Sequence, residues 1–272
     1  MYIWERKQWP EFRWDASAVQ GMVSRYAMEA GALKGGLAQS GADEELIDLM
    51  VSEAVHTSAI EGEDLERDDV RSSLLNQMGL GGSAERDPRT RGIASLMLSV
   101  RRTLDRKLTM EQVLEWHDML FSDPGQRERI AVGRWREGEV RVVSGPMGRE
   151  VVHFVGPPAS RVSTEMAKLV DWLNRTGPHG GREDLPGPVR AGIAHLWFEC
   201  IHPFDDGNGR IGRALAEMVL SQELGRPALL SLSTIIDARR RAYYAALGAA
   251  SKGGLEVTPW LSFFVESVLD AQ

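Results

Sequence analysis

Apolar residues recur every three or four positions along most of this chain, which is the spacing of one face of an α-helix. In the segment 93–104 they alternate with polar and charged residues, as in a helix that buries one side. The segments with this spacing are 17–38, 43–60, 93–104, 110–121, 162–173, 187–200 and 215–224, with a last helix opening at Thr258-Pro259-Trp260. Residues 79–92 and 177–188 are rich in glycine and proline, so we expect loops there.

Residues 133–158 interrupt the helical spacing. Their β-branched and aromatic residues fall into two short runs separated by Gly145-Pro146-Met147-Gly148, which predicts a β-hairpin. The runs are Val140 and Val142, then Val151, Val152 and Phe154. Taken alone, the hairpin is as well explained by a decoration at the edge of a helical protein as by a functional role. The expected fold class is all-α with one small hairpin.

The helices at 187–200 and 215–224 are joined by a stretch dense in chemically active residues. It runs from His202 to Arg213 and reads His-Pro-Phe-Asp-Asp-Gly-Asn-Gly-Arg-Ile-Gly-Arg. Pro203 ends the first helix, and the glycines allow a tight turn, Gly207-Asn208-Gly209, before the second. We therefore expect backbone N–H groups at the start of the second helix to form an anion site.

Four side chains of this stretch suit phosphate chemistry. Arg210 and Arg213 lie three residues apart at the start of a helix, where each guanidinium group can grip two phosphate oxygens. Asp206 offers a hard carboxylate oxygen for a Mg²⁺ that bridges two phosphates. His202 is placed to take a proton from an attacking hydroxyl. Each piece alone is commonly structural, but their combination predicts a catalytic site.

A second informative stretch closes the helix predicted at 43–60. It reads Thr57-Ser58-Ala59-Ile60-Glu61-Gly62, with Gly62 where helices often end in a left-handed residue. Glu61 carries a negative charge at the carboxyl end of a helix, where the helix dipole disfavours it. An acid in that place indicates a basic partner elsewhere, and the arginines of the loop are the candidates.

Composition limits the classes of function. The chain has 272 residues, enough for one large domain or one domain with a small N-terminal piece. A net charge of −7 and a pI of about 5.5 favour neither nucleic acid nor an anionic membrane as the main partner. We find no run of membrane-spanning length and no signal-peptide pattern, and the single Cys200 suits a reducing compartment. We therefore expect a cytoplasmic protein.

Residues 1–15 are unusually aromatic. They contain Trp4, Trp9, Phe12 and Trp14, which we interpret as a hydrophobic clasp that packs the N-terminus onto the body. A partner-binding surface is the alternative, because aromatic residues are enriched at interfaces. We expect residues 1–42 to form a small N-terminal extension and residues 43–272 the main domain.

The stretch His202–Arg213 resembles the signature of Fic-domain proteins, His-Pro-Phe-x-(Asp/Glu)-Gly-Asn-Gly-Arg-x-x-Arg, at every fixed position. The resemblance spans roughly residues 43–270 and implies a Fic-type helical bundle with a hairpin flap over the active site. It also implies transfer of AMP from ATP to a Ser, Thr or Tyr hydroxyl of a target protein, assisted by Mg²⁺. The main domain would then hold an inhibitory helix at about 43–62, the flap at about 138–156 and the catalytic loop 202–213.

By the same resemblance, His202 is the general base and Asp206 the metal ligand. The anion hole for the α- and β-phosphates would comprise Gly207, Asn208, Gly209 and Arg210, and Arg213 would meet the γ-phosphate. Tyr243 and Tyr244 match tyrosines that are common in Fic proteins, and an aromatic ring can stack on adenine. An Asn that the family places somewhat later has no counterpart in Ala249-Ala250-Ser251-Lys252, so the base is less defined than the phosphates.

The run Thr57–Gly62 resembles the inhibitory motif of the family, (Ser/Thr)-x-x-x-Glu-(Gly/Asn), with Thr57, Glu61 and Gly62 as the matching residues. In that motif the glutamate pairs with the second signature arginine, here Arg213, and blocks a productive γ-phosphate pose. The chain is therefore similar to the class that carries its inhibitor N-terminally in the same polypeptide. The flap would hold the target by main-chain pairing at Val140, Arg141, Val142 and Val143.

Other interpretations remain open. The same site could remove AMP from a modified protein, with Glu61 orienting a water, or transfer UMP or phosphate, because the motif specifies the diphosphate grip and not the base. A nucleotide-sensing regulator that only binds ATP is the alternative from a different class, and the intact His202 argues against it. A homodimer is suggested by family analogy alone. We interpret His117 and Asp118 as structural or surface residues and His195 as a core histidine.

Overall fold

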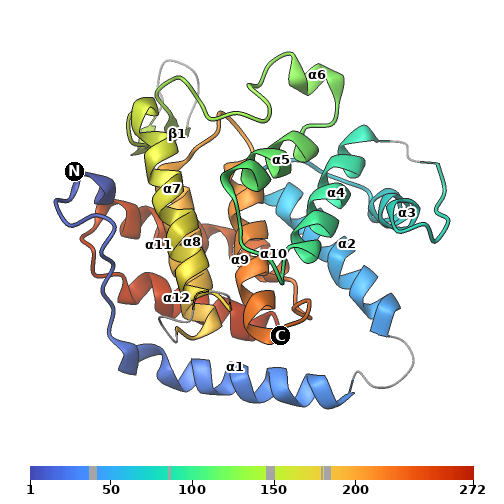
Figure 1. Cartoon of the computed structure of the whole chain (residues 1–272), viewed down its shortest axis with the longest axis horizontal. Helices are drawn as coiled ribbons and strands as arrows, with labels where there is room; N and C mark the ends of the chain where they lie inside the picture. The colour runs from blue at the N-terminus through green and yellow to red at the C-terminus, as the bar shows by residue number, and fades with distance from the viewer. Residues whose placement is uncertain (37–41, 85–86, 145–150, 179, 181–184) are drawn as a thin grey trace.

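The computed structural model describes residues 1–36, 42–84, 87–144, 151–178, 180 and 185–272. These residues form twelve α-helices and one small antiparallel sheet (Figure 1), which confirms the expected fold class. The helices are α1 (Ala16–Gly36), α2 (Ala42–Ile60), α3 (Arg67–Gln77), α4 (Pro88–Arg102), α5 (Met110–Leu120), α6 (Pro124–Arg127), α7 (Ala159–Thr176), α8 (Gly187–Ile201), α9 (Asn208–Leu224), α10 (Leu232–Ala238), α11 (Arg240–Lys252) and α12 (Thr258–Asp270). None of the helices in these ranges is long and apolar enough to cross a membrane.

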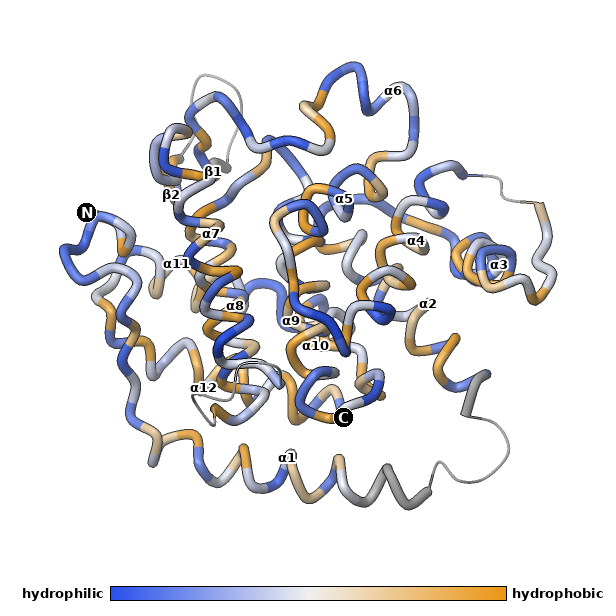
Figure 2. Tube along the Cα trace, in the orientation of Figure 1, coloured by the Kyte–Doolittle hydropathy of each residue, from blue (hydrophilic) through white to orange (hydrophobic). Residues whose placement is uncertain are grey.

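Helix α8 is the centre of the fold, because all fifteen of its residues are buried. A helix buried on every side needs neighbours on every side, and α7, α9 and α12 supply them. Helix α9 runs alongside α8 in the middle of the molecule (Figure 1), and hydrophobic positions gather on α9 and α10 there (Figure 2). The segment that joins α8 to α9 therefore starts and ends in rigid, buried structure.

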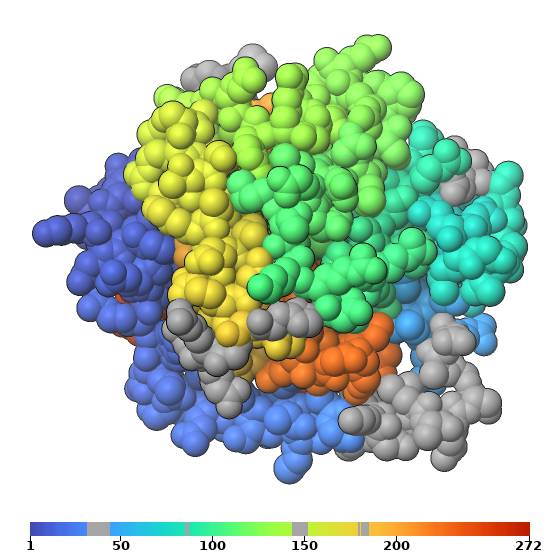
Figure 3. All heavy atoms as spheres, in the orientation of Figure 1, coloured from blue at the N-terminus to red at the C-terminus, as the bar shows by residue number. Residues whose placement is uncertain are grey.

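The aromatic N-terminal residues pack onto the body, as expected of a clasp. Trp9 donates its indole N–H to Glu165 of α7 at 2.9 Å and meets Trp197 of α8 edge-on. Trp4 donates to the carbonyl oxygen of Val155, at the end of the hairpin, at 2.8 Å. Figure 3 shows these first residues, in dark blue, against the yellow surface of α7. The clasp thus ties the N-terminus to the elements that border the hairpin.

Four helices are absent from the sequence-based expectation: α3, α6, α10 and α11. Helix α3 buries four of its eleven residues, and two of those four are polar. Helix α11 buries Tyr243 and Ser251 among its thirteen residues. Their apolar faces are too narrow to stand out as a periodic pattern, so packing against neighbouring helices determines them.

Helix α4 begins earlier than expected, inside the segment 79–92 that we assigned to a loop. Asp87 caps it by accepting the N–H of Arg89 at 2.9 Å, and Pro88 occupies the first helical position. Proline is tolerated there because the first N–H groups of a helix have no partner within the helix. Helix α5 agrees with expectation, since Thr109 caps it by accepting the N–H of Gln112 at 3.1 Å.

The expected hairpin consists of β1 (Arg141–Ser144) and β2 (Val151–Val155), paired antiparallel with Arg141 opposite Val155. The register shifts between Val142 and Val143. The turn expected at Gly145-Pro146-Met147-Gly148 lies outside the described residues.

Gly92 marks a close approach of α4 to the end of α5. A Cβ atom at this position would lie 2.5 Å from the carbonyl oxygen of Leu120 and 2.7 Å from that of Met119. Because backbone atoms cannot move aside as a flexible side chain does, we expect Gly92→Ala to lower the free energy of unfolding by about 2 kcal/mol. Urea denaturation measures this change.

Gly21 in α1 is the matched control, since a Cβ atom there meets nothing within 4 Å. Gly21→Ala should raise the free energy of unfolding by about 0.5–1 kcal/mol, because alanine has the higher helix propensity. Equal effects of the two substitutions would contradict the close contact at Gly92.

Candidate active site

The first functional side chain lies where α8 stops. His202 has φ 50° and ψ 64°, the left-handed region that residues other than glycine rarely adopt, and Pro203 follows it. Among the described non-glycine residues, His202 is the one with a positive φ. Strain of this kind persists where the surrounding structure holds a functional side chain in place.

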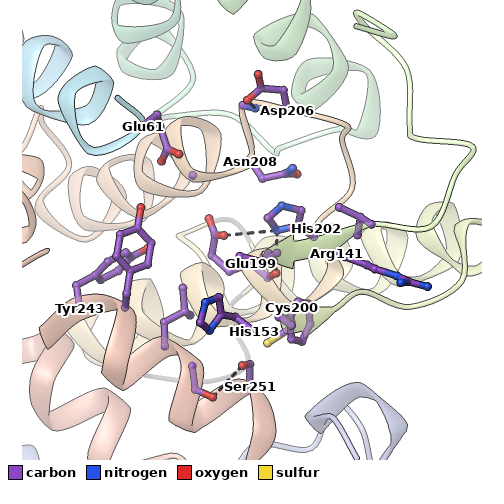
Figure 4. A pocket seen from close by; sticks show the side chains of 18 of the residues that line it. Glu61, Arg141, His153, Glu199, Cys200, His202, Asp206, Asn208, Tyr243 and Ser251 are labelled. Carbon is purple, nitrogen blue, oxygen red and sulfur yellow. Dashed lines mark hydrogen bonds and ion pairs between the residues drawn. The ribbon is translucent and has the colours of Figure 1, made fainter. Parts of the chain in front are cut away.

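The imidazole of His202 is oriented by Glu199, one helical turn earlier. Its Nδ1 lies 3.4 Å from the main-chain oxygen of Glu199 and 3.8 Å from a carboxyl oxygen of the same residue (Figure 4). A proton on Nδ1 facing these oxygens leaves Nε2 free to accept another. Burial lowers the pKa of His202 to about 4, so the ring is neutral at pH 7 and can act as a base. Burial also raises the pKa of the Glu199 carboxyl, to about 8.

Asn208 closes the loop, and its side chain bonds within the loop. Its amide oxygen accepts the N–H of Phe204 at 3.0 Å, and its amide nitrogen donates to the Phe204 carbonyl at 2.8 Å. Helix α9 begins at Asn208, directly after Gly207 with φ 78°, so the turn expected at 207–209 is shorter than the sequence indicates. The candidate anion site therefore consists of main-chain N–H groups in the first turn of α9, and the hydrogen bonds of the Asn208 side chain hold this turn in place.

His117 of α5 supports the loop, a contact that the sequence did not signal. Its Nδ1 accepts the N–H of Gly133 at 3.0 Å, so the ring proton is on Nε2, which donates to the Asp206 carbonyl at 3.2 Å. The ring stacks on Phe204 with centroids 4.0 Å apart, and burial lowers its pKa to about 4. The interpretation of His117 as a structural residue agrees with these contacts.

Arg136 joins the loop to the hairpin. Its buried guanidinium group donates to four carbonyl oxygens, those of His202 at 2.7 Å, Gly138 at 2.7 Å, Pro157 at 2.6 Å and Ile201 at 3.3 Å. Because Gly138 and Pro157 lie just outside the two strands, one side chain aligns the hairpin with the loop that carries His202. This role of Arg136 depends on contacts between distant segments of the chain, which the sequence alone did not indicate.

The acid that we expected to pair with a loop arginine does so. Glu61 accepts from Nη2 of Arg213 at 2.7 Å, and Arg213 also donates to the hydroxyl and the carbonyl oxygen of Thr57. The Arg213 side chain is only 1% exposed, so Glu61 neutralises a positive charge that water does not reach. Burial raises the pKa of Glu61, but the charge and hydrogen bond of Arg213 outweigh it and hold that pKa below its usual value.

The carboxylate of Glu61 lies at the amino end of α9. A Cβ atom on Gly209 would lie 2.1 Å from Oε1 of Glu61, so the missing side chain makes room for the acid. Gly62 has φ 82° and caps α2, as expected. The acid thus sits beside the N–H groups that would otherwise receive an anion.

The loop and Glu61 form one end of a pocket of about 660 Å³. Helix α11 and strand β2 border the other end, near His153 and Ser251 (Figure 4). Tyr243 and Tyr244 both line the pocket. Tyr243 is buried with its hydroxyl 2.8 Å from Nε2 of His195, whereas Tyr244 is 46% exposed. Of the two tyrosines expected to stack on a base, Tyr244 has the more accessible ring. His195 is a core histidine, as interpreted.

The hairpin borders the same pocket through Val140, Arg141 and Val142. The side chains of Val142 and Val152 are exposed, so the sheet presents apolar groups at the surface beside the site. The backbone of Val143 pairs with Val152, and its side chain lies outside the described part of the chain. The hairpin therefore has the position expected of a flap.

Asp206 is the candidate metal ligand. It is exposed at the pocket, and one carboxylate oxygen accepts the N–H of Gly207 at 2.5 Å. Across the residues that the structure describes, no group of three or more His, Cys, Asp or Glu side chains is arranged to hold a metal ion. A Mg²⁺ fits here only with one protein carboxylate and a shell completed by phosphate oxygens and water, which is a common arrangement for this ion.

Parts of the chain match known protein families. Residues 107–220 match the Fic/DOC family, and residues 2–80 match a domain of unknown function (DUF4172). Protein adenylyltransferase fic-1 of Caenorhabditis briggsae is 28% identical over 205 residues, which cover 74% of this chain and 36% of the relative. The chain thus spans little more than a third of that relative's length. The domain boundary expected between residues 42 and 43 stays a prediction.

Two solved structures share the fold. The crystal structure of a Fic family protein from Desulfovibrio desulfuricans G20 is 25% identical, with a TM-score of 0.69, and the match covers 93% of this chain and 72% of that one. The crystal structure of IbpAFic2 covalently tethered to Cdc42 is 14% identical, with a TM-score of 0.55, and the match covers 93% and 69%.

The low pKa of His202 has a consequence for stability. Between about pH 4 and the ordinary pKa of 6.5, the unfolded chain binds a proton at this residue that the folded protein excludes. The free energy of unfolding therefore falls as the pH drops through this window. We expect His202→Ala to make the fall shallower by about 1 kcal/mol per pH unit, measured by urea denaturation at several pH values.

Some pH dependence must persist in this variant. His117 and His195 remain, and burial lowers the pKa of each to about 4. Identical slopes in the wild type and the variant would contradict a buried, neutral imidazole at His202.

Proposed function

Because residues 107–220 of this chain match the Fic/DOC family, we propose that the chain is a protein adenylyltransferase that Glu61 holds inactive. One observation carries the proposal: a neutral histidine, the amino end of α9 and the buried Arg213 converge on a single pocket. Those are the groups that transfer of a nucleotide needs, namely a base, an anion site and a fixed positive charge.

The phosphates of ATP bind at the first turn of α9. Main-chain N–H groups of Asn208, Gly209 and Arg210 point to the anion, and the Arg210 and Arg213 side chains neutralise it. Asp206, at the same pocket, would hold a Mg²⁺ together with the phosphates, and this ion would supply further charge neutralisation. The base of the nucleotide lies toward α11, with the ring of Tyr244 available for stacking.

His202 supplies the base for the chemical step. A hydroxyl oxygen of the target attacks the α-phosphorus of ATP, and Nε2 of His202 takes the hydroxyl proton. A bond forms between the target oxygen and the α-phosphorus as the bond from that phosphorus to the β-phosphate oxygen breaks, and pyrophosphate leaves. Transfer of this kind depends on positioning and charge neutralisation, and the fixed loop provides both.

The target protein approaches through the hairpin. Its exposed strands at the pocket can pair with an extended segment through main-chain hydrogen bonds, which places a hydroxyl side chain near His202. IbpAFic2, which shares this fold, is tethered to the protein Cdc42 in its crystal structure, so a partner of protein size is compatible with the fold.

Glu61 keeps the enzyme inactive by occupying the place of a phosphate. Its carboxylate forms an ion pair with Arg213 at 2.7 Å and lies beside Gly209. The terminal phosphate of ATP therefore meets a negative charge where it needs a positive one. Productive binding therefore requires Glu61 to withdraw. The inhibitor and the substrate compete for the same guanidinium group.

We expect Glu61→Gly to raise AMP transfer about tenfold or more, because the substitution frees Arg213. The measurement is the protein-bound label after incubation with ATP labelled at the α-phosphate, Mg²⁺ and a cell lysate, together with the intact mass of the enzyme itself. Glu61→Gly combined with His202→Ala is the control, and it should transfer no AMP while it still binds ATP.

Equal labelling by wild type and Glu61→Gly would reject autoinhibition by this residue. Absence of transfer by every variant, with ATP still bound, would favour a regulator that senses nucleotide. Loss of AMP from a modified protein, in wild type and not in Glu61→Gly, would favour AMP removal with Glu61 orienting the water.

A further inference from the structure

The turn that ends α2 carries two acids, Glu61 and Glu63. The N–H of Gly62 donates to Ala59 O at 3.0 Å and the N–H of Glu63 donates to Ser58 O at 3.0 Å, with Gly62 in the left-handed region. This pair of hydrogen bonds defines a Schellman motif, which fixes the backbone on both sides of the glycine. The two acidic side chains are therefore delivered to α9 by one rigid turn.

Glu63 binds the other arginine of the loop. Its carboxylate accepts from Nη1 of Arg210 at 2.7 Å, and the side chains are 19% and 3% exposed. The remaining contacts of the guanidinium group are weaker: Asp206 lies 3.6 Å from Nη2, and the ring of Phe121 lies 5.2 Å from the central carbon. Nε of Arg210 has no hydrogen-bond partner among the described residues. Glu63 is thus the principal counter-charge of Arg210.

We infer that Glu63 is a second inhibitory carboxylate, which competes with the nucleotide for Arg210. The inference rests on the proposed function, since it assumes that Arg210 grips phosphate oxygens. Arg210 lies in the first turn of α9, beside Asp206, whereas Arg213 lies one turn further along the helix. Glu63 therefore weakens the grip on the phosphates nearest the helix start, and Glu61 opposes the terminal phosphate.

The Glu61–Arg213 and Glu63–Arg210 contacts form and break together, because one turn carries both acids. The end of α2 is anchored on α10 and α11, because Arg240 donates to the Ala59 carbonyl at 2.8 Å and His56 lies 2.9 Å from Asp237. A movement that withdraws the turn from α9 removes both acids at once. Substitution of one acid leaves the other arginine occupied, so neither substitution alone opens the whole site.

A comparison of ADP with ATP distinguishes the role of Glu63 from that of Glu61, because ADP lacks the terminal phosphate that Glu61 opposes. Isothermal titration calorimetry in the presence of Mg²⁺ measures the affinity of ADP and of ATP for the wild type, Glu63→Gln and Glu61→Gln. We expect Glu63→Gln to tighten ADP and ATP alike, by about tenfold, and Glu61→Gln to tighten ATP about tenfold with a smaller effect on ADP. Asp64→Asn, at the exposed neighbouring residue, controls for the loss of one negative charge and should change neither affinity more than about twofold.

Two outcomes would overturn the inference. An ADP affinity of Glu63→Gln equal to that of the wild type would show that Glu63 does not compete, and a weaker affinity would show that Glu63 positions Arg210 for the phosphates. These outcomes are distinct from failure of the proposed function, in which no variant binds either nucleotide, including the protein with both substitutions. Thermal unfolding of each variant confirms that a changed affinity is measured on folded protein.

Discussion

The connection between α8 and α9 is the constraint on which the rest of the structure depends. Two buried helices meet there, and the chain has only the residues 202–207 in which to end one and begin the next. Left-handed backbone at His202 and Gly207 makes this possible and leaves the N–H groups of α9 at the pocket. Asn208, His117 and Arg136 all bond to main-chain atoms of this connection. Contacts within the protein therefore fix the proposed base and the proposed anion site, which is the preorganisation that electrostatic catalysis requires.

The two arginines of α9 explain why the proposed inhibition fits the fold. Each is almost fully buried, and a buried guanidinium group without a counter-charge is costly. The turn after α2 supplies carboxylates in the free protein, and phosphates can supply negative charge in their place. Exchange of these carboxylates for phosphates would keep both buried guanidinium groups neutralised. In the proposed function, the same electrostatic requirement stabilises the inactive state and prepares the site for a nucleotide.

The helices were predictable where burial of one face makes apolar residues recur at helical spacing along the sequence. Helices α5, α7 and α8 appear near their expected ranges because their apolar residues recur along a buried face. Helices α3 and α11 were missed because few of their residues are buried, and the start of α4 was missed because Pro88 was taken as a loop residue. Contacts between neighbouring elements decided these segments.

The sequence by itself determined the loop chemistry, since histidine, acid, glycines and arginines are adjacent in one run, and their order restricts what they can do. It also indicated that Glu61 needs a basic partner, because an acid at a helix end is unfavourable. Only the tertiary structure decided that Asn208 closes the loop, that Tyr244 and not Tyr243 has the accessible ring, and that Arg136, His117 and Glu63 belong to the site. Those contacts join segments far apart in the chain, and no local pattern encodes which distant side chain will fill a given space.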